Sequence, residues 1–218
     1  MSRLFVPALV AAVLTSSGLE AAETVADRVF GAGLLAGVTQ PTRLHYSYEM
    51  SGQGIDPPLA SHVELDVREI AADGAKAVYI DMFEGQDRRQ FGPIASREQN
   101  PLVLVFLQRD VMQMASLTGG AAMYFQQQIR RAFANEAESE PVEVALGDRK
   151  VPGRRLVMRP FANDPHIDRF PQFRDKVYEF VVAEDVPGGV YLLGSRTPDP
   201  NDGHLVLSET VTFAGAEP

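Results

Sequence analysis

The sequence predicts a mainly β fold of the α+β class, a curved antiparallel sheet or half-barrel of about nine strands wrapped over an inserted helical pair. Two observations predict the sheet. Apolar and polar residues alternate with a period of two before residue 95 and again after residue 139, and short Gly-, Asn- and Asp-rich turns join these segments. A third observation predicts the helices, because apolar residues recur at helical spacing over 100–134.

The N-terminus has the three parts of a secretory signal peptide. Arg3 is followed by an apolar run over 4–14, and small residues such as Ala21 come after it. The run is too short for a membrane span, which needs roughly 20 residues. We therefore expect residues 1–21 to be removed and residues 22–218 to form a single globular domain. That domain would be exported and soluble, in the periplasm of a Gram-negative source.

Composition excludes several classes of protein. The chain has 218 residues, no cysteine and a formal net charge of −9. The absence of thiols excludes disulfide scaffolds, thiolate metal sites, cysteine enzymes and lipid attachment at a lipobox cysteine. The negative charge argues against nucleic acid as a partner, because phosphate groups require a basic face. No later apolar run is long enough to span a membrane, so no integral span is expected after cleavage.

The first half of the domain is expected to contain a helix and a β-meander. Apolar residues at spacings of three and four predict an N-terminal helix over 22–38. The first β-meander covers 42–94, and Gly52–Pro58 is expected to be a loop. The expected strands are 44–50, 63–70, 77–83 and 89–94.

The helical pair covers 100–134. Asn100 is expected to cap the first helix, with Pro101 at its first position. That helix should end at Thr118-Gly119-Gly120, and a second helix should occupy 121–134. The second β-meander covers 139–214, with a proline-rich loop over 160–171. Its expected strands are 142–146, 151–158, 177–183, 190–196 and 205–213.

The helical segment is rich in methionine and aromatic residues, which leaves two interpretations open. In the first interpretation, these side chains are core residues that pack the helices onto the sheet. Alternatively, they line an apolar cavity between the helices and the sheet, because flexible methionines adapt to irregular apolar ligands. In the second interpretation the helices move around Gly119-Gly120 to load and release the ligand. The expected lining residues are Leu102, Phe106, Met114, Phe125 and Ile129.

Two polar features have both a functional and a structural interpretation. Asp164, His166 and Asp168 alternate in sequence and could converge on a divalent ion, or they could serve turns in a proline-rich loop. The basic pairs at 130–131 and 154–155 could hold an acidic head group or partner, or form solvated faces or exposed salt bridges. No motif for a catalytic serine, a P-loop or a dinucleotide is present. We therefore assign no catalytic residue, no metal ligand and no cofactor.

The order of elements resembles that of the periplasmic half-barrel proteins, which include lipoprotein carriers and other lipid-binding proteins. The resemblance covers the strand-rich flanks 42–94 and 142–213 and the helices between them, but no residue motif. It implies a binding protein that holds a lipid or the acyl chains of a lipoprotein. Two alternatives stay open: an envelope protein-interaction module with a filled core, and a metal-assisted hydrolase at Asp164, His166 and Asp168.

Overall fold

The computed structural model describes residue 29 and residues 33–135 and 137–218. The expected signal peptide lies outside the described residues, as does most of the expected N-terminal helix over 22–38. Of that segment, residue 29 and residues 33–38 are described, and residues 33–37 form turns instead of the end of the expected helix. The side chains of Val29, Leu35 and Val38 are buried in the main core.

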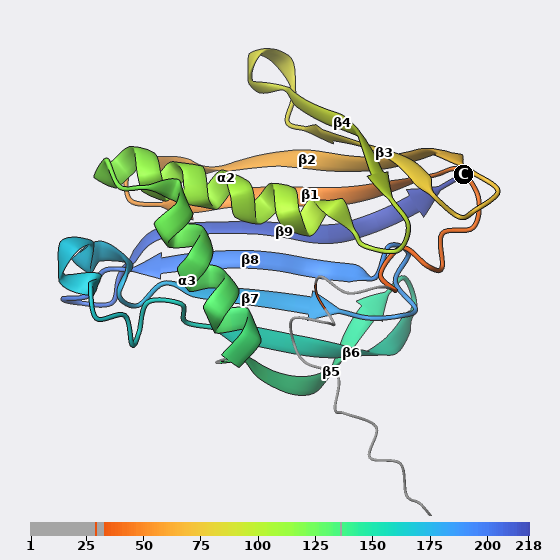
Figure 1. Cartoon of the computed structure of the whole chain (residues 1–218). Helices are drawn as coiled ribbons and strands as arrows, with labels where there is room; N and C mark the ends of the chain where they lie inside the picture. The colour runs from red at the N-terminus through yellow and green to blue at the C-terminus, as the bar shows by residue number, and fades with distance from the viewer. Residues whose placement is uncertain (1–28, 30–32, 136) are drawn as a thin grey trace, which may run out of the picture.

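Nine antiparallel strands form one open sheet in the described part of the chain (Figure 1). Their spatial order is β4-β3-β2-β1-β9-β8-β7-β6-β5. The two meanders are joined where β1, the first strand of the first meander, pairs with β9, the last strand of the second. The strands are β1 (Thr42–Gly52), β2 (Ile55–Ile70), β3 (Lys76–Met82), β4 (Arg89–Ser96), β5 (Glu138–Leu146), β6 (Arg149–Met158), β7 (Val177–Val182), β8 (Val190–Pro198) and β9 (Leu205–Glu217).

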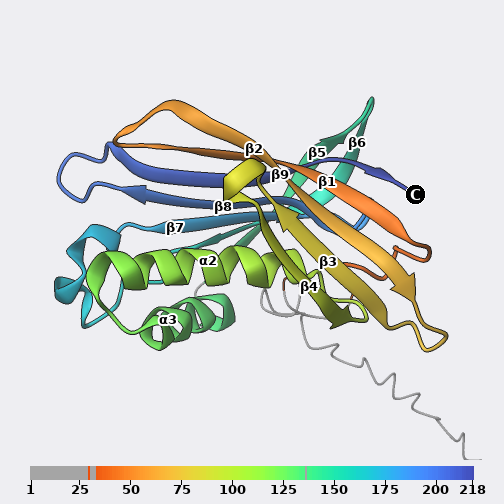
Figure 2. The same ribbon diagram turned by 90° about the horizontal axis from the view of Figure 1, so that it is seen from above.

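Two helices, α2 (Pro101–Thr118) and α3 (Ala122–Asn135), cover one face of this sheet. Figure 2 shows both helices on the same side, with the β3–β4 edge of the sheet bending toward them. Short 3-10 turns, η1 (Gly85–Asp87), η2 (Ile167–Arg169) and η3 (Pro171–Phe173), complete the described elements. The predicted fold class, a curved antiparallel sheet over an inserted helical pair, is confirmed.

Local chemistry sets the ends of α2. The Asn100 side chain accepts a hydrogen bond from the backbone N–H of Leu102 and donates one to the carbonyl of Gly188, so it both caps the helix and ties it to the β7–β8 turn. Pro101 fills the first helical position, where its missing N–H costs nothing. Gly119 ends the helix with φ of +64°, a conformation that favours glycine.

One prediction about the sheet is wrong. The segment expected to be a loop over Gly52–Pro58 contains the start of β2, which begins at Ile55 and pairs with β1. The opposite neighbour, β3, pairs with β2 only from Val63 onward. The first residues of β2 therefore form a sheet edge on that side, where prolines such as Pro57 are tolerated because no N–H is required.

The main core lies between the helices and the sheet. It contains the side chains of alternate strand residues, for example Leu44 and Tyr46 on β1, together with the inner faces of α2 and α3. A smaller cluster around Val144 and Val181 packs on residues of the β5–β8 half. Residues that point away from the core form cross-strand ion pairs such as Arg155 with Glu179, at 2.7 Å. The face opposite the main core therefore carries charged pairs, and in the β5–β8 half it also carries the smaller apolar cluster, since Glu179 and Val181 point to the same side of β7.

Candidate functional site

In the described part of the chain, a groove of about 970 Å³ lies between β4, α2 and α3. Its volume is at the upper end of the range of small-molecule sites, roughly 300–1,000 Å³. The lining residues are Phe91, Leu104, Val105, Leu107, Gln108, Arg109, Val111, Met112, Gln126, Ile129, Arg130 and Phe133.

Apolar side chains at the surface form one wall of this groove. Leu104 is 57% exposed and Met112 is 53% exposed, although both are large hydrophobic residues. They lie eight residues apart on α2 and therefore share one helical stripe. Ile129 and Phe133 of α3 also line the groove, and both are buried. The groove thus presents apolar surface from both helices, which is unusual for surface residues without a ligand or partner.

Four polar side chains line the groove, and none of them is acidic. The Gln126 amide of α3 donates a hydrogen bond of 2.7 Å to the Gln108 amide oxygen of α2, which links the two helices. Arg109 of α2 is part-buried, whereas Arg130 of α3 is exposed. Among the described residues, no hydrogen bond or ion pair engages the Arg130 guanidinium. The groove therefore has an apolar wall and an available positive charge.

Arg109 is held in place by a buried carboxylate and two aromatic rings. Its guanidinium pairs with Glu209 of β9, whose side chain is only 3% exposed. It also lies 4.8 Å from the Phe83 ring centre and 5.7 Å from the Tyr48 ring centre, within cation–π range. Burial, with a smaller contribution from the Glu209 charge, raises the pKa of Tyr48 to about 12. Phe83 has φ of +65°, a strained backbone conformation for a bulky residue.

The next residue of α2, Asp110, forms a second and fully buried attachment to the sheet. Its carboxylate accepts hydrogen bonds from the Lys176 ammonium, at 2.9 Å, and from the Tyr178 hydroxyl. Lys176 also donates to the Thr197 hydroxyl, at 3.2 Å. Burial, followed by the Asp110 charge, raises the pKa of Tyr178 well above its usual range. A second cavity of about 210 Å³ lies beside this network.

The five residues that the sequence predicts as ligand contacts all lie in the main core. Ile129 lines the groove and Met114 lines the smaller cavity. Leu102, Phe106 and Phe125 line neither cavity, and each is at most 1% exposed. Contact of these five side chains with a ligand stays a prediction.

Several groove residues were not among those predicted. Phe91, on the edge strand β4, had no sequence signal because its position depends on how far the sheet bends. Leu104 and Met112 could have been found from their stripe, Leu104-Gln108-Met112, which mixes apolar and polar residues on one helical face. Arg130 belongs to the basic pair for which a head-group role was one of two interpretations.

The proline-rich loop packs against the start of α3. The ring centre of Phe125 lies between 5.2 and 6.0 Å from those of Phe161 and Phe170 in the loop and of Phe173 at the end of η3. The Asp164 carboxylate accepts hydrogen bonds from the Tyr124 hydroxyl and from the backbone N–H of His166. These contacts fix the loop under α3.

The two acidic residues of the loop have different roles, and only Asp164 takes part in this packing. Asp164 is buried and hydrogen bonded, whereas Asp168 is exposed and pairs with Arg174 at 2.8 Å. Asp164, His166 and Asp168 do not form a group with ligand atoms within 4.8 Å of one another. The described residues therefore provide no metal-ligating arrangement at this position.

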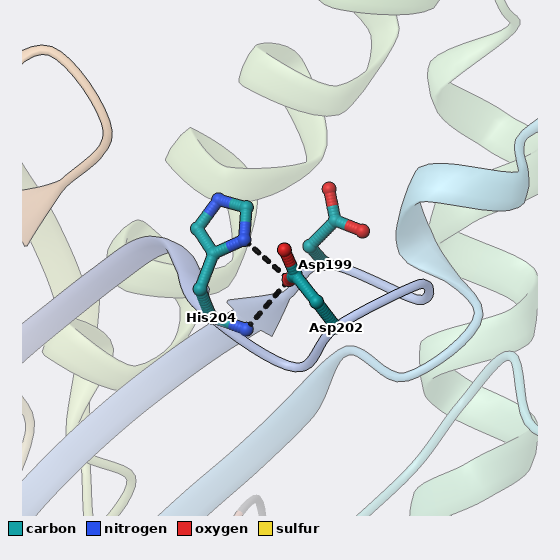
Figure 3. Close-up of side chains that lie close together, drawn as sticks. All are labelled: Asp199, Asp202 and His204. Carbon is teal, nitrogen blue, oxygen red and sulfur yellow. Dashed lines mark hydrogen bonds and ion pairs between the residues drawn. The ribbon is translucent and has the colours of Figure 1, made fainter.

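A different acidic group lies in the turn between β8 and β9. Asp199, Asp202 and His204 place one potential ligand atom each within 4.8 Å of one another (Figure 3). Asp202 accepts hydrogen bonds from the backbone N–H and the ring Nδ1 of His204, which lower the pKa of the Asp202 carboxyl. Asp199 accepts from the backbone N–H of Asn201. These bonds are ordinary turn chemistry of aspartate.

In the part of the chain that the structure describes, no helix combines the length and the apolar character needed to cross a membrane.

No protein-family model and no curated protein matches the chain. Solved structures with a similar fold include the MucA/MucB complex of Pseudomonas aeruginosa, with 16% identity over 88% of this chain and a TM-score of 0.40. This chain spans 55% of that matched chain. They also include the lipoprotein LppX of Mycobacterium tuberculosis, with 10% identity, coverage of 83% and 93%, and a TM-score of 0.32.

A LolA superfamily protein from Nitrosomonas europaea has 9% identity, coverage of 88% of this chain and 91% of its own, and a TM-score of 0.24. At these identities the likeness concerns the fold alone.

Proposed function

We propose that this protein is an exported binding protein that holds an apolar ligand, such as a lipid or an acyl chain, in the groove between β4, α2 and α3. The single observation that supports this best is the pair of large apolar side chains, Leu104 and Met112, that α2 exposes to a cavity of about 970 Å³. A ligand there would remove both side chains from water, which is worth about 25 cal/mol per Å² of apolar surface buried.

The proposed site differs in position from the cleft expected between the helices and the sheet. That space is filled by the protein's own side chains, including Phe106 and Phe125. A bulky polar substitution at either residue is expected to unfold the protein, because it would bury an unpaired polar group. The test of binding therefore belongs at the exposed residues of α2.

Export to the periplasm is part of the same proposal. It is supported by the signal-peptide pattern of residues 1–21, since the apolar run is too short to span a bilayer. An exported carrier would meet lipids and lipoproteins in the cell envelope. Sequencing the N-terminus of the protein from its native host would test this directly, with a mature chain that begins at about residue 22 as the expected result.

The first experiment is native mass spectrometry of the mature protein purified from its own envelope, followed by solvent extraction. An additional mass that extracts as lipid is the expected result. A bare mass near that of the cleaved chain, together with no uptake of added fatty acid, would contradict the proposal.

Substitutions at exposed residues of α2 test whether the ligand binds in the groove. Leu104→Glu and Met112→Glu place a charge on the apolar wall and are expected to weaken binding by about tenfold or more, because the charge would have to be desolvated on binding. Both residues are exposed, so the fold should survive. Leu117→Glu is the matched control, since Leu117 is exposed on the same helix and lies outside the groove. Equal loss of binding in all three variants would place the ligand elsewhere.

A second candidate function is an envelope protein-interaction module. It is favoured by Leu117 and Met123, which are each 67% exposed on either side of the turn between α2 and α3. Addition of a partner strand is disfavoured at the two sheet edges, because Pro93 interrupts β4 and Pro141 interrupts β5. Leu117→Glu separates the two functions: loss of a cross-linked partner with lipid binding intact would support the interaction module.

A further inference from the structure

The charge of the groove differs from that of the whole chain. The chain has a formal net charge of −9. The groove lining has two arginines, Arg109 and Arg130, and no aspartate or glutamate. A ligand that enters the groove therefore meets a positive local environment on an otherwise acidic protein.

The two arginines differ in whether a carboxylate pairs with the guanidinium. Arg109 is neutralised by the buried Glu209 carboxylate and fixed by the Phe83 ring. Arg130 is exposed, and among the described residues no carboxylate pairs with its guanidinium. Its neighbour Arg131 has an interaction of its own. Arg130 is thus the cation of the groove that remains available for a ligand.

Arg130 lies next to the apolar surface that would hold a chain. On α3 it follows Ile129 directly and precedes Phe133 by three residues, and all three line the groove. The long arginine side chain can keep its charge in water while its stem covers apolar surface. An acyl chain along Ile129 and Phe133 would therefore have its head within reach of the guanidinium.

We infer that the groove selects an acyl chain with an anionic head, a carboxylate or a phosphate, and that Arg130 binds that head. The guanidinium matches both groups, because its planar N–H donors can bind two oxygens at once. This inference rests on the proposed function, since it names the class of ligand for the same groove.

The test compares three ligands that share a twelve-carbon chain and differ in their head group. Binding of dodecanoate, dodecyl phosphate and dodecanol is measured by calorimetry at pH 7.5, with inorganic phosphate as a ligand without a tail. The two anions are kept below their micelle-forming concentrations and dodecanol below its solubility limit. The wild-type protein is expected to bind both anions about fivefold more tightly than the alcohol, a preference of the size of a partly exposed ion pair. The preference should decrease as salt is added.

Arg130→Gln is expected to reduce the ratio of anion to alcohol affinity to about one. Arg154→Gln removes an exposed arginine of β6 that lies outside the groove and should leave the ratio unchanged. An unchanged ratio in Arg130→Gln, or equal binding of all three ligands by the wild type, would overturn the inference and leave the proposed function standing. Inorganic phosphate that binds as tightly as dodecyl phosphate would also overturn it. Failure of every tailed ligand to bind would reject the proposed function as well.

Discussion

The two helices that cover the sheet are attached to it in different ways. Helix α2 has charged and polar groups whose partners are buried: Arg109 binds Glu209, and Asp110 binds Lys176 and Tyr178. Helix α3 packs mainly through rings and aliphatic side chains, with Phe125 against the loop rings and Phe133 at 5.6 Å from Phe180.

Directional hydrogen bonds and buried ion pairs allow one register, whereas apolar contacts are non-directional and tolerate a shift. We therefore expect α2 to form a fixed wall of the groove and α3 a wall that can move. A fixed wall preserves the position of Leu104 and Met112, and a movable wall lets the groove accept ligands of different width. This difference is open to test with substitutions of similar chemistry in the two helices.

The largest effect is expected from deleting one phenylalanine ring in each helix. Phe106→Ala in α2 should lower the free energy of unfolding by about 5 kcal/mol, and Phe125→Ala in α3 by about 3 kcal/mol, the two ends of the usual range. Both residues are buried, so the lost burial is similar. The difference arises because α3 can move to close the cavity and α2 cannot. Urea unfolding of both variants measures it, and equal losses would remove the distinction between the helices.

The next largest loss of stability is expected when the buried ion pair between Asp110 and Lys176 is broken. Asp110→Ala leaves the Lys176 ammonium, which is 1% exposed, without its carboxylate. The free energy of unfolding should fall by about 4 kcal/mol, because an unpaired charge is then buried. The double variant Asp110→Leu with Lys176→Met removes both charges and should recover most of that loss. A double variant no more stable than Asp110→Ala would show that the pair is not what holds α2.

A smaller loss of stability is expected when the ion pair between Arg109 and Glu209 is broken. Arg109→Met keeps the length of the side chain but leaves Glu209 without a cation, and we expect a loss of about 2 kcal/mol. The loss is smaller than at Asp110 because Arg109 is 29% exposed and water can partly replace it. Thermal unfolding at pH 7 measures the effect. If Arg109→Met is as stable as the wild type, α2 is attached at Asp110 alone.

Much of the fold was predictable because its signals are local. Asn100 and Gly119 mark the ends of α2 through capping chemistry that involves only nearby residues. Alternation of apolar and polar residues placed the strands, since it depends on the two-residue period of a strand. The start of β2 was missed because its tolerance of Pro57 depends on where β3 stops pairing.

The candidate site was less predictable because it depends on distant pairs. Asp110 and Lys176 are 66 residues apart, and nothing in the sequence pattern of either segment indicates that they meet. Leu104 and Met112 lie on a helical stripe that also contains Gln108, and this stripe indicates a mixed helical face but not what lies opposite it. Only the position of α3 and the bend of the sheet toward α2 decide that these two side chains face a groove rather than the core.

The smallest expected effect is the loss of one tyrosine hydrogen bond at each helix. Tyr178 binds Asp110 of α2, and Tyr124 of α3 binds Asp164. Burial and the Asp110 charge raise the pKa of Tyr178 in the folded state, whereas tyrosine in the unfolded chain titrates near pH 10. The hydroxyl therefore contributes stability that is fully present below pH 10 and is lost as pH rises, because only the unfolded chain ionises easily. Tyr178→Phe should cost about 1 kcal/mol at pH 7, the value of one hydrogen bond.

That cost should shrink above pH 10. Tyr124 of α3 is the matched control, since burial and Asp164 raise its pKa with the same sign. Its hydroxyl is only part-buried, so Tyr124→Phe should cost less at pH 7. Urea unfolding of both variants at pH 7 and pH 10.5 measures the difference. A cost at Tyr124 equal to that at Tyr178 would mean that α3 has a polar attachment as strong as that of α2, and the groove would then have two fixed walls.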